Sequence, residues 1–186
     1  MARDFSIYSS VNLVSLVFLL GTALVLRRYL GPLQAGIWIT LELLPNYAQY
    51  APLGILNSAE RDLPYLLGAE RVSEFDRRKH TLFWLTHAIG AALTISVLAG
   101  VLLFRPHISS PALLVGLLAY APILWLQILA AYYVVLYRAR KRFVPLSARQ
   151  GIANLTKAVL TMAGGYAFGL YGVFAALLAA AVVQAV

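Results

Sequence analysis

Long apolar segments alternate with short polar gaps along the whole chain. Six segments are candidates for membrane-crossing helices: Ile7–Leu26, Ile37–Asn57, Thr81–Phe104, Ala112–Tyr137, Gly151–Leu170 and Tyr171–Val186. A helix needs about 20 apolar residues to cross a bilayer, and no polar gap is long enough for an independent soluble domain. The pattern therefore predicts an all-α fold, a polytopic transmembrane bundle of about six helices that forms one domain over residues 1–186.

The last apolar segment is shorter than a crossing requires. Tyr171–Val186 falls short of the about 20 residues that a transmembrane helix needs, and no anchoring charge follows it. We therefore expect the sequence to stop within its sixth helix and to be the N-terminal part of a longer protein.

Polar residues inside the apolar segments follow helical spacing. Successive residues of a helix are about 100° apart around its axis. A helix that covers the fifth segment and the residue before it therefore carries on one narrow face Gln150, Asn154, Lys157, Thr161, Gly164 and Phe168. The second segment carries Glu42, Asn46 and Gln49 on one face. The third carries His80, Trp84, His87 and Thr94, and the fourth a weaker set of Tyr120, Gln127 and Arg138.

A carboxylate or ammonium group that faces lipid costs several kcal/mol. We therefore expect the polar faces of the second and fifth segments to line a water-filled cavity. The candidate cavity residues are Lys157, Asn154, Glu42, Asn46, Gln49 and His87.

Other interpretations of these residues stay open. The Lys157 ammonium can reach toward the lipid headgroups along its own helix, and Glu42 can lie at headgroup level. His87 fits a packed, hydrogen-bonded histidine as well as a proton relay. Pro45 and Pro52 are expected to bend the second segment, which suits either a moving, cavity-lining helix or a kink that packing imposes.

Composition and charge agree with a membrane protein. The chain is 61% hydrophobic and 12% charged, whereas soluble domains carry about 25% charged residues. The absence of cysteine excludes disulfides and thiolate zinc sites. The net charge of +8 raises the possibility of nucleic-acid binding, but the basic residues flank apolar segments, as anchoring residues do. We therefore expect no nucleic-acid partner.

Basic residues concentrate in alternate gaps. The second and fourth gaps hold Arg61, Arg71, Arg77, Arg78, Lys79, Arg138, Arg140, Lys141, Arg142 and Arg149. The opposite side of the predicted topology holds Arg27, Arg28 and Arg105. Because cytoplasmic loops carry an excess of Lys and Arg, the N-terminus is predicted to be cytoplasmic.

No motif of a soluble catalytic centre is present. The sequence has no Gly-x-Ser-x-Gly, no phosphate-binding loop and no His-Glu-x-x-His. His80, His87 and His107 are not spaced with carboxylates as a metal site requires. We therefore expect no enzymatic activity and no cofactor or metal.

Two stretches carry a resemblance to a known family. "RRYLGPLQAGIW" contains a Leu-Gly-Pro-x-x-x-Gly pattern at Leu30, Gly31, Pro32 and Gly36. "PLGILNSAERDLPYLLGAERVSEFDRRKHTLFW" contains a Gly-x-x-Asn-x-x-x-Arg-x-x-Pro-Tyr pattern at Gly54, Asn57, Arg61, Pro64 and Tyr65. Both resemble the N-terminal part of polysaccharide-export flippases in the multidrug/oligosaccharidyl-lipid/polysaccharide (MOP) superfamily.

The resemblance implies one lobe of a MATE/MOP-like transporter with two lobes. The implied activity is to flip an undecaprenyl-pyrophosphate-linked oligosaccharide across the bacterial inner membrane for surface polysaccharide (O-antigen) synthesis. The implied partners are this lipid-linked glycan, membrane lipid, a coupling H⁺ or Na⁺ and a C-terminal lobe. Lys157 and Arg61 are the positions implied to meet the pyrophosphate.

Two other functions remain open at this stage. A cation-coupled multidrug exporter of the same fold would use Glu42 to take up a proton or sodium ion. A non-transporting scaffold for envelope biosynthesis would use the basic stretch "RARKRF" to dock on anionic lipid.

Overall fold

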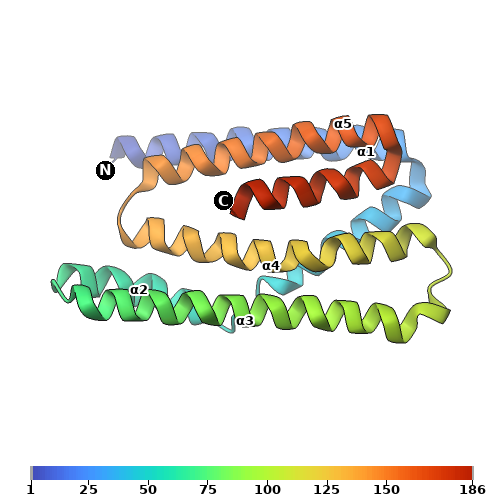
Figure 1. Cartoon of the computed structure of the whole chain (residues 1–186). Coiled ribbons are helices and arrows are strands. Elements are labelled where there is room, and N and C mark those ends of the chain that lie inside the picture. Colours follow the sequence, from blue (N-terminus) through green and yellow to red (C-terminus); the bar gives the residue numbers. More distant parts are fainter. Residues whose placement is uncertain (1, 186) are drawn as a thin grey trace.

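The structure is a computed structural model that describes residues 2–185, with side chains from Leu13 onward except Ser15. These residues contain no strand and form five α-helices: α1 (Ala2–Ala48), α2 (Ile55–Gly68), α3 (Val72–Phe104), α4 (Pro111–Ala139) and α5 (Phe143–Ala185). A single 3₁₀ turn, η1 (Arg105–His107), follows α3. The predicted all-α helical bundle is confirmed (Figure 1).

The longest two helices each fold back on themselves at a glycine. Gly31 has φ 71° in α1 and Gly169 has φ 61° in α5, a left-handed backbone that side chains with a Cβ rarely adopt. At each break the chain reverses, so α1 and α5 each consist of two arms (Figure 1). The Leu-Gly-Pro pattern thus marks a turn.

These breaks explain why the number of helices differs from the predicted six. The first two predicted segments share α1, and the last two share α5. Within the described residues, four helices are long and apolar enough to cross a membrane: Leu16–Ala48, Val72–His107, Pro111–Ala139 and Phe143–Ala185. This is the arrangement of a multi-pass membrane protein.

Three predicted boundaries were wrong. The third segment was expected to begin at Thr81, but α3 already begins at Val72. The second segment was expected to continue to Asn57, but α1 ends at Ala48 and turns occupy residues 49–54, with the N–H of Ile55 bonded to the Pro52 carbonyl at 2.9 Å. Gly54, at φ 80°, then begins α2. Pro52 therefore lies between helices, whereas Pro45 lies inside α1. The fifth segment was expected to begin at Gly151, but α5 already begins at Phe143.

The charged second gap forms α2 and the start of α3. In α2 the apolar side chains of Leu63 and Leu66 are buried, whereas Arg61 is exposed. The buried side packs against Phe75 on α3 and Val135 on α4. The gap therefore contains a short helix, α2, which is stabilised by burial of one apolar face.

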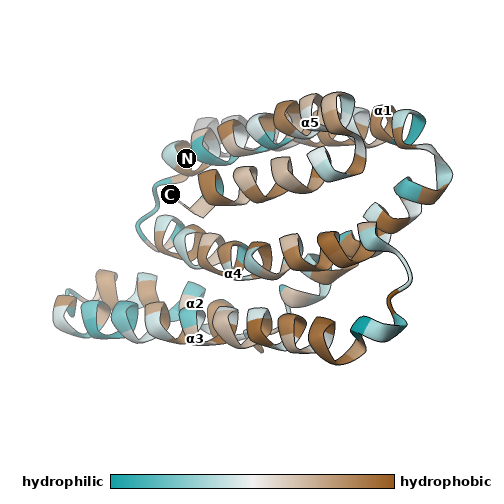
Figure 2. Cartoon of the chain, turned by 45° about the vertical axis from the view of Figure 1, so that its right-hand side comes forward, coloured by the Kyte–Doolittle hydropathy of each residue, from teal (hydrophilic) through white to brown (hydrophobic). Residues whose placement is uncertain are grey.

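Helix α4 lies at the centre and packs on α1, α2, α3 and α5. The main core joins α1, α4 and α5 around Leu41, Tyr120 and Phe174. On the outside, large apolar side chains are exposed, among them Val17, Leu102 and Val159. Figure 2 shows hydrophilic residues concentrated on α2 and the start of α3, and hydrophobic residues along the rest of α3. An apolar outer surface of this kind suits contact with lipid.

The N-terminus and most connections lie at the two ends of the bundle, whereas the α1–α2 connection lies near its middle (Figure 1). The N-terminus, the α2–α3 turn and the α4–α5 connection lie at one end, and the Gly31 break, η1 and the Gly169 break lie toward the other (Figure 1). The basic gaps therefore share an end. The prediction that this end is cytoplasmic stays a prediction.

Candidate functional site

Lys157 and Glu42 meet inside the bundle. The Nζ of Lys157 on α5 lies 4.0 Å from Oε1 of Glu42 on α1, with side chains 27% and 29% exposed. The hydroxyl of Tyr120 on α4 donates to the same carboxylate oxygen at 3.2 Å. Three helices thus converge on one carboxylate, as expected of polar groups within an apolar bundle.

The pair lies deep along both helices. Lys157 is near the middle of the first arm of α5, about 20 Å from Phe143 and from Gly169, and Glu42 is about 16 Å beyond Gly31, at 1.5 Å per residue. The ammonium therefore finds its counter-charge at its own depth rather than at a helix end. This arrangement accounts for both charges without contact with headgroups.

The polar face of α5 is turned inward. Asn154 and Lys157 are partly buried and Thr161 is buried, whereas Ile152 and Val159 on the other faces are 63% and 64% exposed. The Thr161 hydroxyl donates to the Lys157 carbonyl at 2.5 Å. The exception is Phe168, which is 76% exposed. The expected orientation of this helix is therefore observed from Asn154 to Thr161.

A small cavity adjoins the ion pair. It measures about 20 Å³, which is room for about one water molecule, and it lies between Glu42, Lys157 and Tyr120. Gln127 on α4 and Gln184 on the second arm of α5 complete its polar lining. These groups can provide the two to four hydrogen-bond partners that a buried water needs.

A larger groove lies on the other side of the pair. It measures about 360 Å³ and runs between the two arms of α1 and α5. Glu42 and Lys157 line it together with Arg27, and Trp38 and Ile39 form part of its apolar wall. The groove thus contains two cationic side chains and one carboxylate.

A third hollow, of about 270 Å³, lies between α4 and α5. Its polar lining consists of Arg149, Gln150, Asn154 and Gln184. Arg149 donates to the Gln184 carbonyl at 2.6 Å, and the Gln150 side-chain oxygen is buried without a hydrogen-bond partner. Gln184 also lines the small cavity, so this residue borders both the small cavity and the third hollow.

Four predicted cavity residues lie elsewhere. Asn46 and Gln49 are exposed at the end of α1, where the Gln49 amide donates to the Asn46 carbonyl at 2.8 Å. Arg61 is exposed on α2. None of the three lines the small cavity or the groove that hold the ion pair. Asn46 lies in the last turn of α1, and Gln49 lies beyond its end at Ala48.

His87 is the fourth of these residues. It packs between aromatic rings, 4.1 Å from Phe83 and 5.9 Å from Trp125 between ring centroids, and its Nδ1 lies 2.9 Å from the Phe83 carbonyl. It lines neither hollow that contains the ion pair. This is the environment of a packed, hydrogen-bonded histidine.

Sequence reasoning missed Arg27 and underrated Tyr120. Arg27 was interpreted only as an anchor at a helix end, and its place in the groove depends on the reversal at Gly31 that follows it. Tyr120 belongs to the weak polar set of the fourth segment, and a long-range contact makes it important. No group of three or more metal-ligating side chains occurs among the residues that the structure describes.

Comparisons with models of protein families, with curated proteins and with solved structures give no match for this chain.

Proposed function

We propose that this chain is one lobe of a transporter that flips an undecaprenyl-pyrophosphate-linked oligosaccharide across the inner membrane. The observation that carries the proposal is the Lys157–Glu42 pair at mid-depth, with hollows on both sides of it. Charged side chains within a membrane bundle typically mark the path of a polar substrate. The resemblance of the Leu-Gly-Pro and Asn-x-x-x-Arg patterns to MOP flippases supplies the substrate class.

In this proposal the ion pair is the resting state of the binding site. The diphosphate enters the groove between α1 and α5 and replaces the Glu42 carboxylate as the partner of the Lys157 ammonium. Arg27, in the same groove, provides a second cation. The Tyr120 hydroxyl keeps its bond to the displaced Glu42, which limits the cost of leaving that carboxylate without a cation. The polyprenyl chain stays in the bilayer.

The test replaces Lys157 with Met in the protein as its own cell produces it. Surface glycan and the amount of protein in the membrane are measured together. We expect Lys157→Met to abolish export at an unchanged protein level, whereas Lys141→Met, in the exposed α4–α5 connection, leaves export intact. Full export by Lys157→Met would overturn the proposal.

Two measurements separate the alternatives. An exporter coupled to H⁺ or Na⁺ would move drugs against a gradient and lose this activity in Glu42→Gln, with no movement of lipid-linked sugar in vesicles. An envelope scaffold would move neither compound. Reconstituted protein that flips the lipid-linked sugar, and loses this activity in Lys157→Met, supports the flippase.

A further inference from the structure

A groove between α2 and α3 is separate from the site described above. It measures about 360 Å³, within the size range of about 300 to 1,000 Å³ typical of ligand sites. One face of α2 and one face of α3 form its walls, with Ile55, Ser58, Ala59, Asp62, Leu63, Arg77, Arg78, Thr81, Leu82 and Leu85. Its residues belong to the first part of α2 and to the facing part of α3, so the groove extends from the α1–α2 connection toward the α2–α3 turn.

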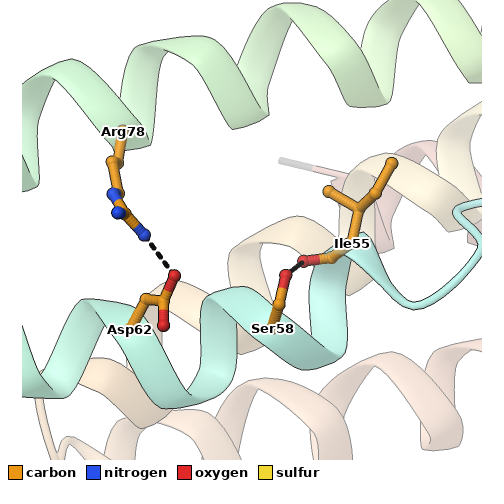
Figure 3. A network of polar contacts seen from close by, with 4 residues as sticks. All are labelled: Ile55, Ser58, Asp62 and Arg78. Carbon is orange, nitrogen blue, oxygen red and sulfur yellow. Dashed lines mark hydrogen bonds and ion pairs between the residues drawn. The ribbon is translucent and has the colours of Figure 1, made fainter.

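The pairing of the two helices gives this groove a polar end and an apolar end. Arg78 on α3 bonds to Asp62 on α2 (Figure 3). Because the helices run in opposite directions, this pair sets Ile55 near the level of Leu85. The groove therefore changes from charged to aliphatic along its length, and its aliphatic end is where the apolar part of α3 begins.

The charges in the groove do not cancel. Asp62 neutralises Arg78, but no carboxylate among the described side chains lies within ion-pair distance of Arg77. The hydroxyl of Thr81 donates to the Arg77 backbone carbonyl at 3.0 Å, so its oxygen remains free to accept. The groove thus presents one uncompensated guanidinium above an aliphatic wall.

We propose that this groove holds one phospholipid with a net negative headgroup. The phosphate accepts hydrogen bonds from the Arg77 guanidinium, and an acyl chain lies against Ile55, Leu82 and Leu85. A single negative charge matches the single uncompensated cation, whereas a zwitterionic headgroup adds an ammonium beside Arg77 and Arg78. A soluble phosphate would gain nothing from the aliphatic wall. The occupant also bridges α2 to the first membrane-spanning part of α3.

The experiment uses the purified chain in detergent and counts bound lipids by native mass spectrometry. Phosphatidylglycerol and phosphatidylcholine with the same acyl chains are titrated separately. Arg77→Gln loses a charge-assisted hydrogen bond, so it should bind the first phosphatidylglycerol at least about tenfold more weakly than the unchanged protein does. The matched control Arg142→Gln removes a charge from the exposed α4–α5 connection and should change binding by less than about fivefold.

Two further variants test the groove without a change of charge. Ser58→Phe and Leu85→Trp place bulk in the groove at exposed positions, and both should weaken phosphatidylglycerol binding while helical content stays unchanged. Equal losses in Arg77→Gln and Arg142→Gln, equal binding of the two lipids, or full binding by both filled variants would each overturn the proposal. The proposal of a lipid in the α2–α3 groove does not depend on the transport function.

Discussion

Lys157 and Glu42 come from opposite parts of the sequence and face each other at 4.0 Å across the bundle. Each lies on a helix arm that begins or ends at a glycine break, and Tyr120 on the central helix bonds to the same carboxylate. The fold therefore brings a cation, a carboxylate and a hydroxyl to one point at mid-depth.

Removal of both charges should cost less than the sum of the two single removals. We expect Lys157→Met and Glu42→Gln each to lower the free energy of unfolding by about 1 to 3 kcal/mol, below the 3 to 5 typical of fully buried pairs, because both side chains are more than a quarter exposed. The double variant should recover at least about 0.5 kcal/mol relative to the sum. Unfolding in mixed micelles gives the free energy of unfolding of the unchanged protein, the two single variants and the double variant. Strict additivity of the two losses would contradict a direct contact.

The Tyr120 hydroxyl should contribute a smaller amount. Tyr120→Phe removes its bond to Glu42 and keeps the ring, which packs against Phe174 at 6.2 Å between centroids. We expect a loss of about 1 kcal/mol, and no further loss in the background of Glu42→Leu, which removes the acceptor oxygen. The same unfolding assay gives both values, and an equal loss in both backgrounds would show that the hydroxyl acts elsewhere.

The reversal of α5 depends on a close approach of two glycines. A Cβ on Gly172 would collide with the Gly164 carbonyl, whereas a Cβ on Gly21 meets nothing within 4 Å. We expect Gly172→Ala to lower the midpoint of thermal unfolding and Gly21→Ala to leave it unchanged or raise it, since alanine favours helix by about 1 kcal/mol. Equal midpoints for the two variants would mean that the arms of α5 do not pack closely.

The attachment of α2 depends on Leu63. This side chain is 0% exposed, whereas Leu53 in the preceding turn is 89% exposed. Leu63→Ala should lower the free energy of unfolding by about 2 to 4 kcal/mol and increase proteolysis between Tyr50 and Arg71. Leu53→Ala, which removes the same atoms, should change neither by a measurable amount. Equal proteolysis of the two variants would contradict the packing of α2 on α3 and α4.

Local sequence patterns predicted the parts of this structure that depend on periodicity. The inward face of α5 with Asn154 and Lys157 was predicted because helical spacing alone determines which side chains share a face. Asn46 and Gln49 share a face with Glu42 by the same rule, but they line none of the hollows around it. Gln49 lies beyond the helix, because α1 ends at Ala48. Periodicity does not indicate where a helix stops.

The contacts between distant segments were harder to predict from the sequence. Gly31 and Gly169 look alike as glycines within apolar sequence, and only one of them precedes a proline, so the reversal at Gly169 had no comparable signal. The contribution of Arg27 to the groove and of Tyr120 to the carboxylate follows from these reversals. Such positions depend on tertiary packing, which single-sequence patterns do not contain.

The central claim is that the Lys157 face of α5 lies along a hydrated path. Because the chain has no cysteine, single-cysteine variants can be labelled in intact membranes without background, using a membrane-impermeant maleimide applied to both sides. The account predicts that Asn154→Cys and Lys157→Cys react, whereas Val159→Cys, on the outward face, does not. Protection of both inward positions from the reagent would contradict it.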